Sequence, residues 1–295
     1  MTHAGASAPV FLIGTGRCGS SLLLQLLGYH PAFSWQSHWT SWLPGGGRWA
    51  FTQRIHDLPG AWRLAVNPAS RAIPQPTESY RLLRAATDGL FTAPRELRAE
   101  ELTPVAAAKL HELVARHNQA SARHRFLLKH TGFPRVAYLR AAFPDARFIH
   151  VVRDGRAVAS SLCKVDWWSG EGQWGWGPLD RADRALYAES GHHEIVLAGL
   201  YWKVLMAEYA KARAETPSEA LLEIRYDALV RRPVDTLRQI LTFLDMPEHA
   251  RLWERLAETP LMDEDDRWRR ALTQDEVGWL ERALGPALAA HGFAG

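Results

Sequence analysis

Residues 14–21 have the composition of a loop that binds a phosphate-like anion. They read GTGRCGSS, with Gly14 and Gly19 five positions apart, and they lie between the apolar run 10–13 and a run of three leucines. This order predicts a strand, a glycine-rich turn and a helix. The unpaired N–H groups and the dipole of such a helix attract an anion to its N-terminus.

The loop lacks the lysine of nucleoside-triphosphatase loops. A loop of that kind carries lysine at the position of Ser20, from where it reaches the terminal phosphates of the nucleotide. The strong cation here is Arg17, two residues before Gly19. We therefore expect the loop to bind a phosphate-like group other than the end of ATP.

A second anion site is predicted within residues 147–162, which read RFIHVVRDGRAVASSL. Residues 148–152 are mostly apolar and rich in β-branched side chains, as in a buried parallel strand, and the residues that follow favour a helix. Arg153 therefore ends a strand, and Ser160 and Ser161 lie in the next helix. Because ligands of open α/β sheets collect outside the carboxyl ends of the strands, these side chains can converge on an anion. Two anion sites on neighbouring strands indicate a ligand that is phosphorylated at both ends.

The stretches GTGRCGSSLLLQLL and VVRDGRAVASS resemble the two cofactor motifs of sulfotransferases that use 3'-phosphoadenosine 5'-phosphosulfate (PAPS). The pattern is closest to the tyrosylprotein, carbohydrate and bacterial types. The resemblance implies that Arg17 binds the 5'-phosphosulfate, with Ser20 and Ser21 in place of the usual threonine pair. It implies that Arg153 and Ser161 bind the 3'-phosphate. The implied activity is in-line transfer of a sulfuryl group from PAPS to an acceptor hydroxyl, which leaves 3'-phosphoadenosine 5'-phosphate (PAP).

Two later stretches extend the resemblance, which covers residues 9–38, 125–162 and 220–291. LLEIRYDALVRRPVDTLRQILTFL is similar to a strand and helix of the family that bring Tyr226 near the nucleotide, although Ala228 replaces an acidic residue. RWRRALT resembles a basic segment that closes over the cofactor. The cofactor-binding residues implied in this way are Gly16, Arg17, Cys18, Gly19, Ser20, Ser21, Arg153, Ser161, Tyr226, Arg267 and Arg269.

Arg17 and Lys129 are the predicted catalytic cations. Sulfuryl transfer needs positive charge where negative charge develops on the leaving phosphate, as in phosphoryl transfer but with less charge on the moving group. Lys129 follows the apolar run 126–128, so it points into the crevice at the strand ends. The resemblance implies that a lysine there contacts the transferred group. With these cations in place we expect no metal.

The predicted general base is His38. Counted without gaps from the anion loop, the chain shares His30 and Pro31 with tyrosylprotein-type sulfotransferases, and their catalytic glutamate position falls on His38. A histidine with a pKa of about 6.5 can abstract a proton near neutrality. Glu78 and His130 are the reserve candidates, and a packing role for His38 stays open.

Tryptophans indicate the acceptor region. One group follows the first anion motif and another follows the second: Trp35, Trp39, Trp42 and Trp49, then Trp167, Trp168, Trp174 and Trp176. Such side chains stack on sugars or aromatic acceptors, so we expect both groups to rim one crevice, with the run GEGQWGWGP as a lid. The alternative is that each tryptophan only fills the core. The predicted acceptor is a saccharide or a small-molecule alcohol or phenol.

These residues require an α/β fold of three layers, a P-loop-type parallel sheet flanked by helices. The predicted strands cover residues 9–14, 125–129, 147–152 and 221–225. The predicted helices cover residues 19–29, 134–142, 155–162, 192–213 and several segments after 233, with two or three more between 54 and 120. Residues 32–50 are expected to be irregular.

The domain organisation follows from the lack of a linker, a repeat or a low-complexity tract. We expect one sulfotransferase domain over residues 1–295. Within it, residues 9–38 hold the phosphosulfate loop and the base, and residues 147–162 the 3'-phosphate motif. A helical and tryptophan-rich insertion, residues 39–120 and 166–190, forms the acceptor region.

Composition sets the broad class. The net charge is +3 with acids and bases interspersed, which suits a polyanionic cofactor and gives no basic patch for nucleic acid. Cys18 and Cys163 cannot form a disulfide scaffold, and the N-terminus has no secretory pattern. No apolar stretch reaches the roughly 20 residues of a membrane span. We expect a cytoplasmic protein without a membrane span, and a homodimer stays open.

Three function classes compete. The first is a PAPS-dependent sulfotransferase. The second is a P-loop kinase or nucleoside triphosphatase in which Asp154 binds magnesium; the missing loop lysine and the intervening Arg153 argue against it. The third is a non-catalytic nucleotide-binding protein of the same fold, which the absence of glutamate at position 38 favours. Binding of PAP against binding of ATP with magnesium separates the first two, and turnover separates the first from the third.

Overall fold

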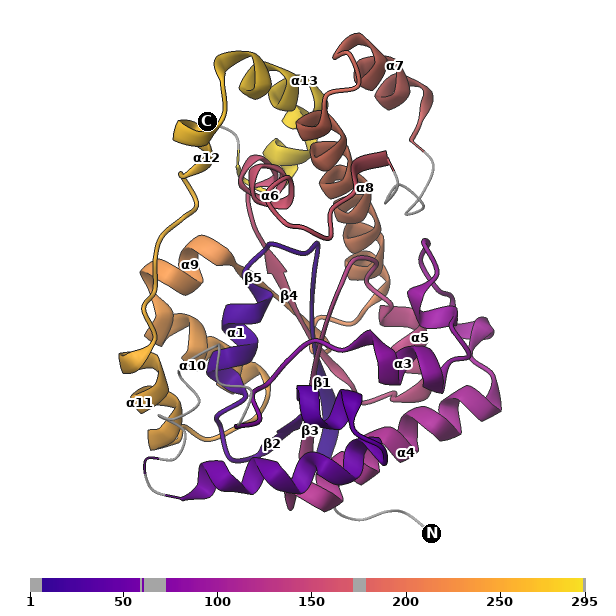
Figure 1. Ribbon diagram of the computed structural model, residues 1–295, viewed down its shortest axis with the longest axis vertical. Helices are drawn as coiled ribbons and strands as arrows, with labels where there is room; N and C mark the ends of the chain where they lie inside the picture. The colour runs from indigo at the N-terminus through magenta and orange to yellow at the C-terminus, as the bar shows by residue number, and fades with distance from the viewer. Residues whose placement is uncertain (1–6, 59, 61–72, 172–178, 294–295) are drawn as a thin grey trace.

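The computed structural model describes residues 7–58, 60, 73–171 and 179–293. A five-stranded parallel sheet forms its centre. In this sheet β1 (Ser7–Gly14) lies between β3 (Arg125–Thr131) and β4 (Arg147–Val152), with β2 (Phe33–Trp35) and β5 (Leu221–Arg225) at the two edges. Helices cover both faces of the sheet (Figure 1). The predicted α/β fold with a parallel sheet between helical layers is confirmed.

The strands are buried on both faces, which explains their nearly continuous apolar sequences. Alternate side chains of β1 enter different cores: Phe11 and Ile13 pack on one face of the sheet, and Val10 and Leu12 on the other. None of the four is more than 2% exposed. Because burial of each such side chain is worth roughly 1.5–3 kcal/mol, the two cores fix the central strand between the helical layers.

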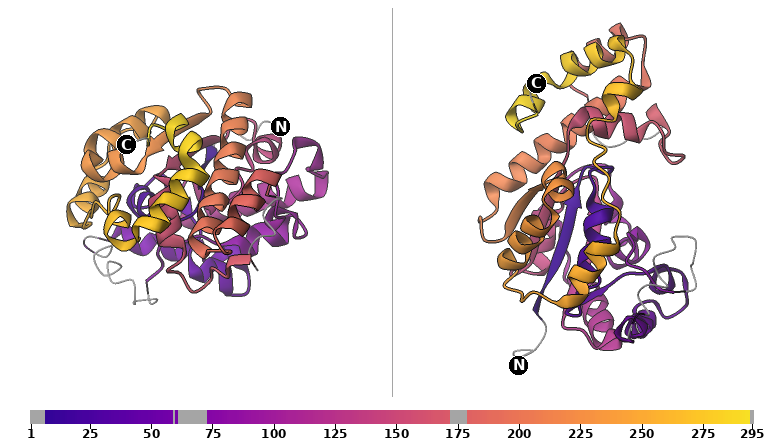
Figure 2. Two further views of the ribbon diagram at one scale, coloured as in Figure 1. Left: turned by 90° about the horizontal axis from the view of Figure 1, so that it is seen from above. Right: turned by 90° about the vertical axis from the view of Figure 1, so that its left-hand side faces the viewer.

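Two groups of helices form the outer layers, as the right-hand view of Figure 2 shows. The core on the Phe11 face includes residues of α3 (Tyr80–Ala86), α4 (Pro104–Ser121), α5 (Val136–Ala142), α6 (Gly155–Leu162), α8 (Glu194–Glu215) and α13 (Gln274–Ala290). The core on the Leu12 face includes residues of α1 (Ser20–Leu27), α9 (Tyr226–Arg231), α10 (Pro233–Phe243) and α11 (Ala250–Glu258).

The stretch 32–50 is more regular than the sequence analysis predicted. It contains β2, α2 (His38–Trp42) and the start of the 3₁₀ helix η1 (Gly46–Asp57). Ser37 caps α2, since its hydroxyl accepts from the backbone N–H of Thr40 at 3.2 Å and the Thr40 hydroxyl accepts from the N–H of Ser37 at 2.9 Å. A strand of three residues is too short to show a period, so only its pairing with β3 defines it.

Most other predicted elements agree with the structure. β4 and α6 have the predicted bounds, whereas β3 continues past the predicted end at residue 129 to Thr131. The helix α7 (Arg181–Glu189) was not predicted, nor were the short helices η3 (Leu90–Thr92), η4 (Ala99–Glu101) and α12 (Trp268–Ala271) as separate elements. Residues 172–178, which include Trp174, Trp176 and most of the predicted lid, lie outside the described residues. Within the described ranges, no helix combines the length and the hydropathy needed to cross a bilayer.

The strand order creates the place for a site. The chain continues from β1 to β2 and β3 on one side and then to β4 and β5 on the other, so its direction across the sheet reverses at β1. Ligands of open α/β sheets bind outside the carboxyl ends of the strands at such a point. In Figure 1 this edge of the sheet faces α6, α8 and α13.

Candidate active site

A cavity of about 670 Å³ opens at the carboxyl ends of β1, β3 and β4. Both predicted anion motifs contribute to its walls. The predicted site residues that line it are Gly16, Arg17, Gly19, Ser20, Ser21, Lys129, Arg153 and Tyr226. Ser161 joins this group through a hydrogen bond to Arg17.

The anion loop turns sharply between β1 and α1. Gly16 and Gly19 have φ values of 81° and 95°, in the left-handed region that glycine adopts without strain. A Cβ on Gly19 would lie 2.3 Å from the ring of Tyr226, so only glycine fits between the loop and α9. Gly19 is also the N-cap of α1, and because it has no side chain it makes no capping hydrogen bond to the helix. The first N–H groups of α1 therefore remain available to a ligand in the cavity.

The Cys18 side chain lies in the core and not in the wall of the cavity. It is fully buried in the core on the Leu12 face. A Cβ on Gly14 would meet the Cys18 sulfur at 2.5 Å, so the side chain fills the space inside the turn. Cys18 does not belong to the lining of the cavity as the described residues define it. Any contact of Cys18 with a ligand is limited to its backbone.

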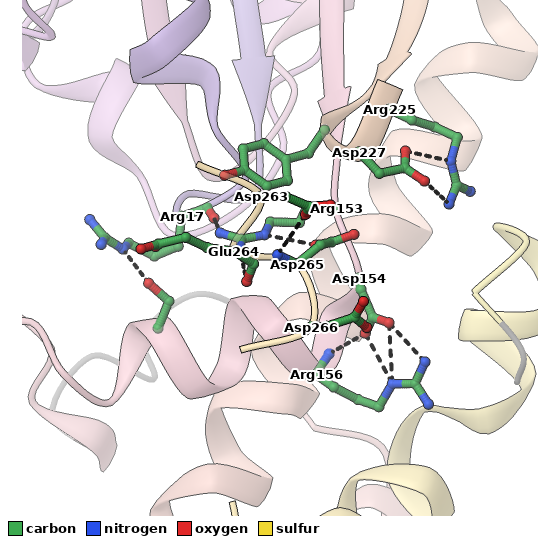
Figure 3. A network of polar contacts seen from close by, with 12 residues as sticks. Arg17, Arg153, Asp154, Arg156, Arg225, Asp227, Asp263, Glu264, Asp265 and Asp266 are labelled. Carbon is green, nitrogen blue, oxygen red and sulfur yellow. Dashed lines mark hydrogen bonds and ion pairs between the residues drawn. The ribbon is translucent and has the colours of Figure 1, made fainter. Parts of the chain in front are cut away.

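The two anion motifs touch each other (Figure 3). Arg17 has a φ of 53°, and its Nε donates to the Ser161 hydroxyl on α6 at 3.0 Å. An N–H of the Arg153 guanidinium donates to the backbone carbonyl of Arg17 at 3.1 Å. These bonds span 144 and 136 residues of sequence, respectively. Residues predicted for two ends of one ligand thus lie at one end of one cavity.

Arg153 is buried, and each of its three guanidinium nitrogens donates a hydrogen bond to a protein group. Its side chain is 9% exposed, and its Nε pairs with the Asp265 carboxylate at 3.1 Å. Another of its N–H groups donates to the carbonyl of Glu264 at 2.8 Å, and the guanidinium lies 4.2 Å from the centre of the Tyr226 ring. Tyr226 in turn donates its hydroxyl proton to the carbonyl of Met262 at 3.2 Å. The segment before α12 therefore covers Arg153, one of the two predicted 3'-phosphate residues (Figure 3).

Lys129 forms an ion pair with Glu78 on the other side of the cavity. The side chains are 7% and 24% exposed, and both residues line the cavity. Oε1 of Glu78 lies 2.6 Å from the Tyr80 hydroxyl and accepts from the Thr131 hydroxyl at 2.9 Å. The backbone N–H of Thr131 donates to the Tyr80 hydroxyl at 2.7 Å. These contacts hold a carboxylate and an ammonium side by side at the end of β3.

The candidate bases lie in different environments. His38 begins α2, with its ring centre 6.1 Å from that of Trp39, and the described residues that line the cavity do not include it. His130 does line the cavity, but burial lowers its pKa to about 3 and its Nε2 has no hydrogen-bond partner among the described residues. Glu78, the other reserve candidate, is the carboxylate beside Lys129.

Arg267 and Arg269 lie at the surface. Their side chains are 66% and 53% exposed and pair with Glu264 at 2.6 Å and Asp266 at 3.1 Å, within their own segment. Neither lines the cavity as far as the described residues show. Their contact with the cofactor stays a prediction, and an acidic residue rather than a basic one reaches inward from this segment.

Asp154 serves the helix α6. Its carboxylate accepts from the backbone N–H of Arg156 at 2.8 Å and so caps the helix. The Arg156 guanidinium bonds to both carboxylate oxygens, and it lies 4.4 Å from the centre of the Trp268 ring. The carboxylate that a kinase would use for magnesium is thus engaged by an arginine.

Apolar side chains form one part of the cavity wall. Phe91, Phe133 and Leu205 belong to this wall, together with Trp167. The Arg135 guanidinium donates to the carbonyls of Ala93 and Arg95 and so ties the loop after η3 to the wall.

The tryptophans of the first group do not line the cavity as the described residues define it. Trp35 is 2% exposed in the core on the Leu12 face, and Trp42 is 72% exposed beneath the guanidinium of Arg81. From the second group, Trp167 is 51% exposed and lines the cavity, whereas Trp168 is buried against Tyr201. The described tryptophans of the two groups therefore do not form a common rim around the cavity.

Sequence reasoning missed three contributors to the site. Tyr80 and Thr131 orient Glu78, and Asp265 pairs with Arg153. The acidic run 263–266 directly before RWRR is visible in the sequence, but it does not show which arginine each acid pairs with. The contacts of Tyr80 carry no comparable local signal.

The chain matches known sulfotransferases. Residues 9–250 match the model of a family described as the sulfotransferase family. The fold is similar to that of sulfotransferase STF9 from Mycobacterium avium, with a TM-score of 0.59 and 19% identity over 97% of this chain and 77% of that chain. Sulfotransferase STF1 from Mycobacterium tuberculosis H37Rv gives 0.52 and 19% over 95% and 77%. A sulfotransferase domain from the curacin biosynthetic pathway gives 0.52 and 14% over 96% and 99%. No curated protein sequence matches the chain.

Proposed function

We propose that this chain, which belongs to the sulfotransferase family, transfers a sulfuryl group from PAPS to the hydroxyl group of a small acceptor. The observation that carries the proposal is the contact between the two anion motifs. Arg17 bonds to Ser161, and Arg153 bonds to the backbone of Arg17, at one end of a single cavity. Two adjoining anion sites suit a nucleotide with phosphates on both the 3' and the 5' positions.

The hydrogen-bond donors of the chain suit such a nucleotide. The N-terminus of α1, with Ser20 and Ser21, offers N–H and hydroxyl groups to the 5'-phosphosulfate. The guanidinium of Arg153 and the hydroxyl of Ser161 offer charge-assisted hydrogen bonds to the 3'-phosphate. The Tyr226 ring, packed on Gly19, lies between the two sites. We take residues 1–295 as one domain for this reaction.

Glu78 and Lys129 perform the transfer in this proposal. Glu78 takes the proton of the acceptor hydroxyl as the oxygen–sulfur bond forms, and the bond between sulfur and the phosphate oxygen breaks. Its electron pair stays on the phosphate, where Lys129 and Arg17 stabilise the developing charge. Glu78 replaces His38 as the proposed base because Glu78 lines the cavity beside Lys129.

The apolar wall indicates the class of acceptor. Phe91, Phe133 and Leu205 favour an apolar body, because pockets of this kind gain affinity by removing such surface from water. Trp167 offers a ring at the edge of this wall. Of the acceptors that the sequence leaves open, we therefore propose a small alcohol or phenol with an apolar body.

The proposal is tested by product formation. The enzyme is incubated with PAPS and, in separate reactions, 2-naphthol, 1-octanol, glucose or a tyrosine peptide, and the sulfate esters are measured by mass spectrometry. We expect esters of naphthol or octanol, formed together with PAP, and no phosphorylated product when ATP and magnesium replace PAPS. Glu78→Gln serves as the inactive control. An ester of glucose alone would contradict the acceptor class, and phosphoryl transfer from ATP would contradict the reaction.

A further inference from the structure

The segment between α11 and α12 carries four successive acidic residues, 263–266, which we call the acidic strap. In Figure 1 the chain ascends from α11 along the side of the molecule to α12. Three of the four side chains pair with arginines of the surface: Asp263 with Arg231 at 2.6 Å, Glu264 with Arg267 at 2.6 Å, and Asp266 with Arg269 at 3.1 Å.

Asp265 is the acidic residue of the strap that turns inward (Figure 3). Its side chain is 12% exposed and accepts from Nε of Arg153 at 3.1 Å. The carbonyl of Glu264 accepts a second hydrogen bond from the same guanidinium at 2.8 Å. The strap thus occupies two N–H groups of the arginine that we assign to the 3'-phosphate.

A carboxylate and a phosphate compete for such an arginine. Both present oxygens to the same edge of the guanidinium, and both make charge-assisted hydrogen bonds with it. The buried Arg153 cannot hold the two anions on the same N–H groups. Burial also raises the pKa of Asp265, a sign that the carboxylate gives up solvation to reach this position.

We propose that Asp265 determines the affinity of the enzyme for 3'-phosphorylated nucleotides, by occupying Arg153 until a 3'-phosphate displaces it. The inference rests on the proposed function, because it assigns Arg153 to the 3'-phosphate. The strap then weakens the binding of PAPS and PAP alike. It also returns to Arg153 when PAP departs, which speeds product release.

The competition concerns one end of the nucleotide. Adenosine 5'-phosphosulfate carries the same 5' group as PAPS but has no 3'-phosphate, so it binds without moving Asp265. A general effect of negative charge near the cavity would instead change the affinities for both nucleotides together. PAP and adenosine 5'-phosphosulfate also differ at the 5' position, so the contact at Arg153 is isolated by the change that a variant causes in each affinity, and not by the difference between the two affinities.

Calorimetry with Asp265→Asn tests the inference. We expect the dissociation constant for PAP to fall about 10-fold, since a partly buried ion pair no longer has to break, and that for adenosine 5'-phosphosulfate to change less than about twofold. Asp266→Asn is the matched control, with the same change of charge in the same segment but a side chain that pairs with Arg269. It should leave both constants within about twofold. Asp265→Ser repeats the test with a second side chain that lacks the carboxylate.

The outcomes separate this inference from the proposed function. Wild-type enzyme that binds PAP, together with Asp265 variants that bind it no more tightly, would overturn the role of Asp265 and leave the function intact. Equal gains for both nucleotides would also overturn it. If the wild type and the variants all fail to bind PAP, the proposed function is contradicted and the inference falls with it. A slower release of PAP from Asp265→Asn in stopped-flow experiments would support the displacement.

Discussion

Glu78 and Lys129 meet at the end of β3 although 51 residues separate them in the chain. The carboxylate is oriented by Tyr80 and Thr131, so its second oxygen is directed to the lysine. Neither residue belongs to a sequence motif that would indicate the other as its partner. The sequence predicted Lys129 as a catalytic cation from its place at a strand end, and it gave Glu78 only as a reserve candidate for the base. Pairing between distant segments produces no characteristic residue spacing in the sequence.

Glu78→Gln tests the base. The amide keeps the size of the side chain and a hydrogen-bonding oxygen but cannot take the acceptor proton. We expect kcat to fall about 10²- to 10⁴-fold, the range for loss of a general base, with the dissociation constant of PAP within about threefold of the wild type. Both values are measured with the acceptor that the product assay identifies. His38→Gln is the control and should retain kcat within about twofold, whereas a large loss in that variant alone would return the base to His38.

Lys129→Met tests the cation. Since Lys129 acts on charge that develops during transfer, its removal should reduce kcat far more than it weakens PAP binding. Lys109→Met removes a lysine whose side chain is 40% exposed and pairs with Asp88, and it should change neither quantity.

With Arg17 and Lys129 supplying the positive charge, activity should also survive treatment with EDTA. Complete loss of activity with EDTA would contradict this account of the transfer.

At the scale of elements, the anion loop and α9 are fitted to each other through Gly19. The glycine combines a φ of 95° with a close approach to the Tyr226 ring. The sequence predicted the order of strand, turn and helix at the loop correctly, because glycine spacing between an apolar strand and a helix is a local signal. It did not predict β2, because that strand of three residues is defined only by its pairing with β3. It did not predict α7 either.

Gly19→Ala should disturb both the loop and α9. The added methyl group would lie 2.3 Å from the Tyr226 ring, in a backbone conformation that alanine rarely adopts. We expect the free energy of unfolding to fall by about 2–3 kcal/mol in urea titrations, together with weaker PAP binding. Gly89→Ala is the control, because Gly89 has a φ of 90° but its added Cβ would touch nothing within 4 Å. It should lose only about 1 kcal/mol. Equal losses in the two variants would show that the contact with Tyr226 has no energetic effect.

At the scale of the molecule, the strand order brings distant motifs to one edge. The anion loop follows β1, Lys129 lies at the end of β3, Arg153 follows β4 and Tyr226 follows β5, so a parallel sheet places all of them around one cavity. The sequence predicted this convergence, because parallel strands share the edge at which they end. It could not predict the strap, since Asp265 is 112 residues from Arg153 and meets it only after the last helices have packed.

The central claim is that Arg153 binds the 3'-phosphate of the sulfuryl donor, and calorimetry with two nucleotides tests it most directly. Arg153→Ala should weaken PAP binding by about 1.5–3 kcal/mol, the worth of a charge-assisted hydrogen bond, and barely affect adenosine 5'-phosphosulfate. Arg147→Ala removes an arginine from the opposite end of the same strand and should bind both nucleotides as the wild type does. Equal losses for both nucleotides in Arg153→Ala, or an unchanged affinity of that variant for PAP, would contradict the account.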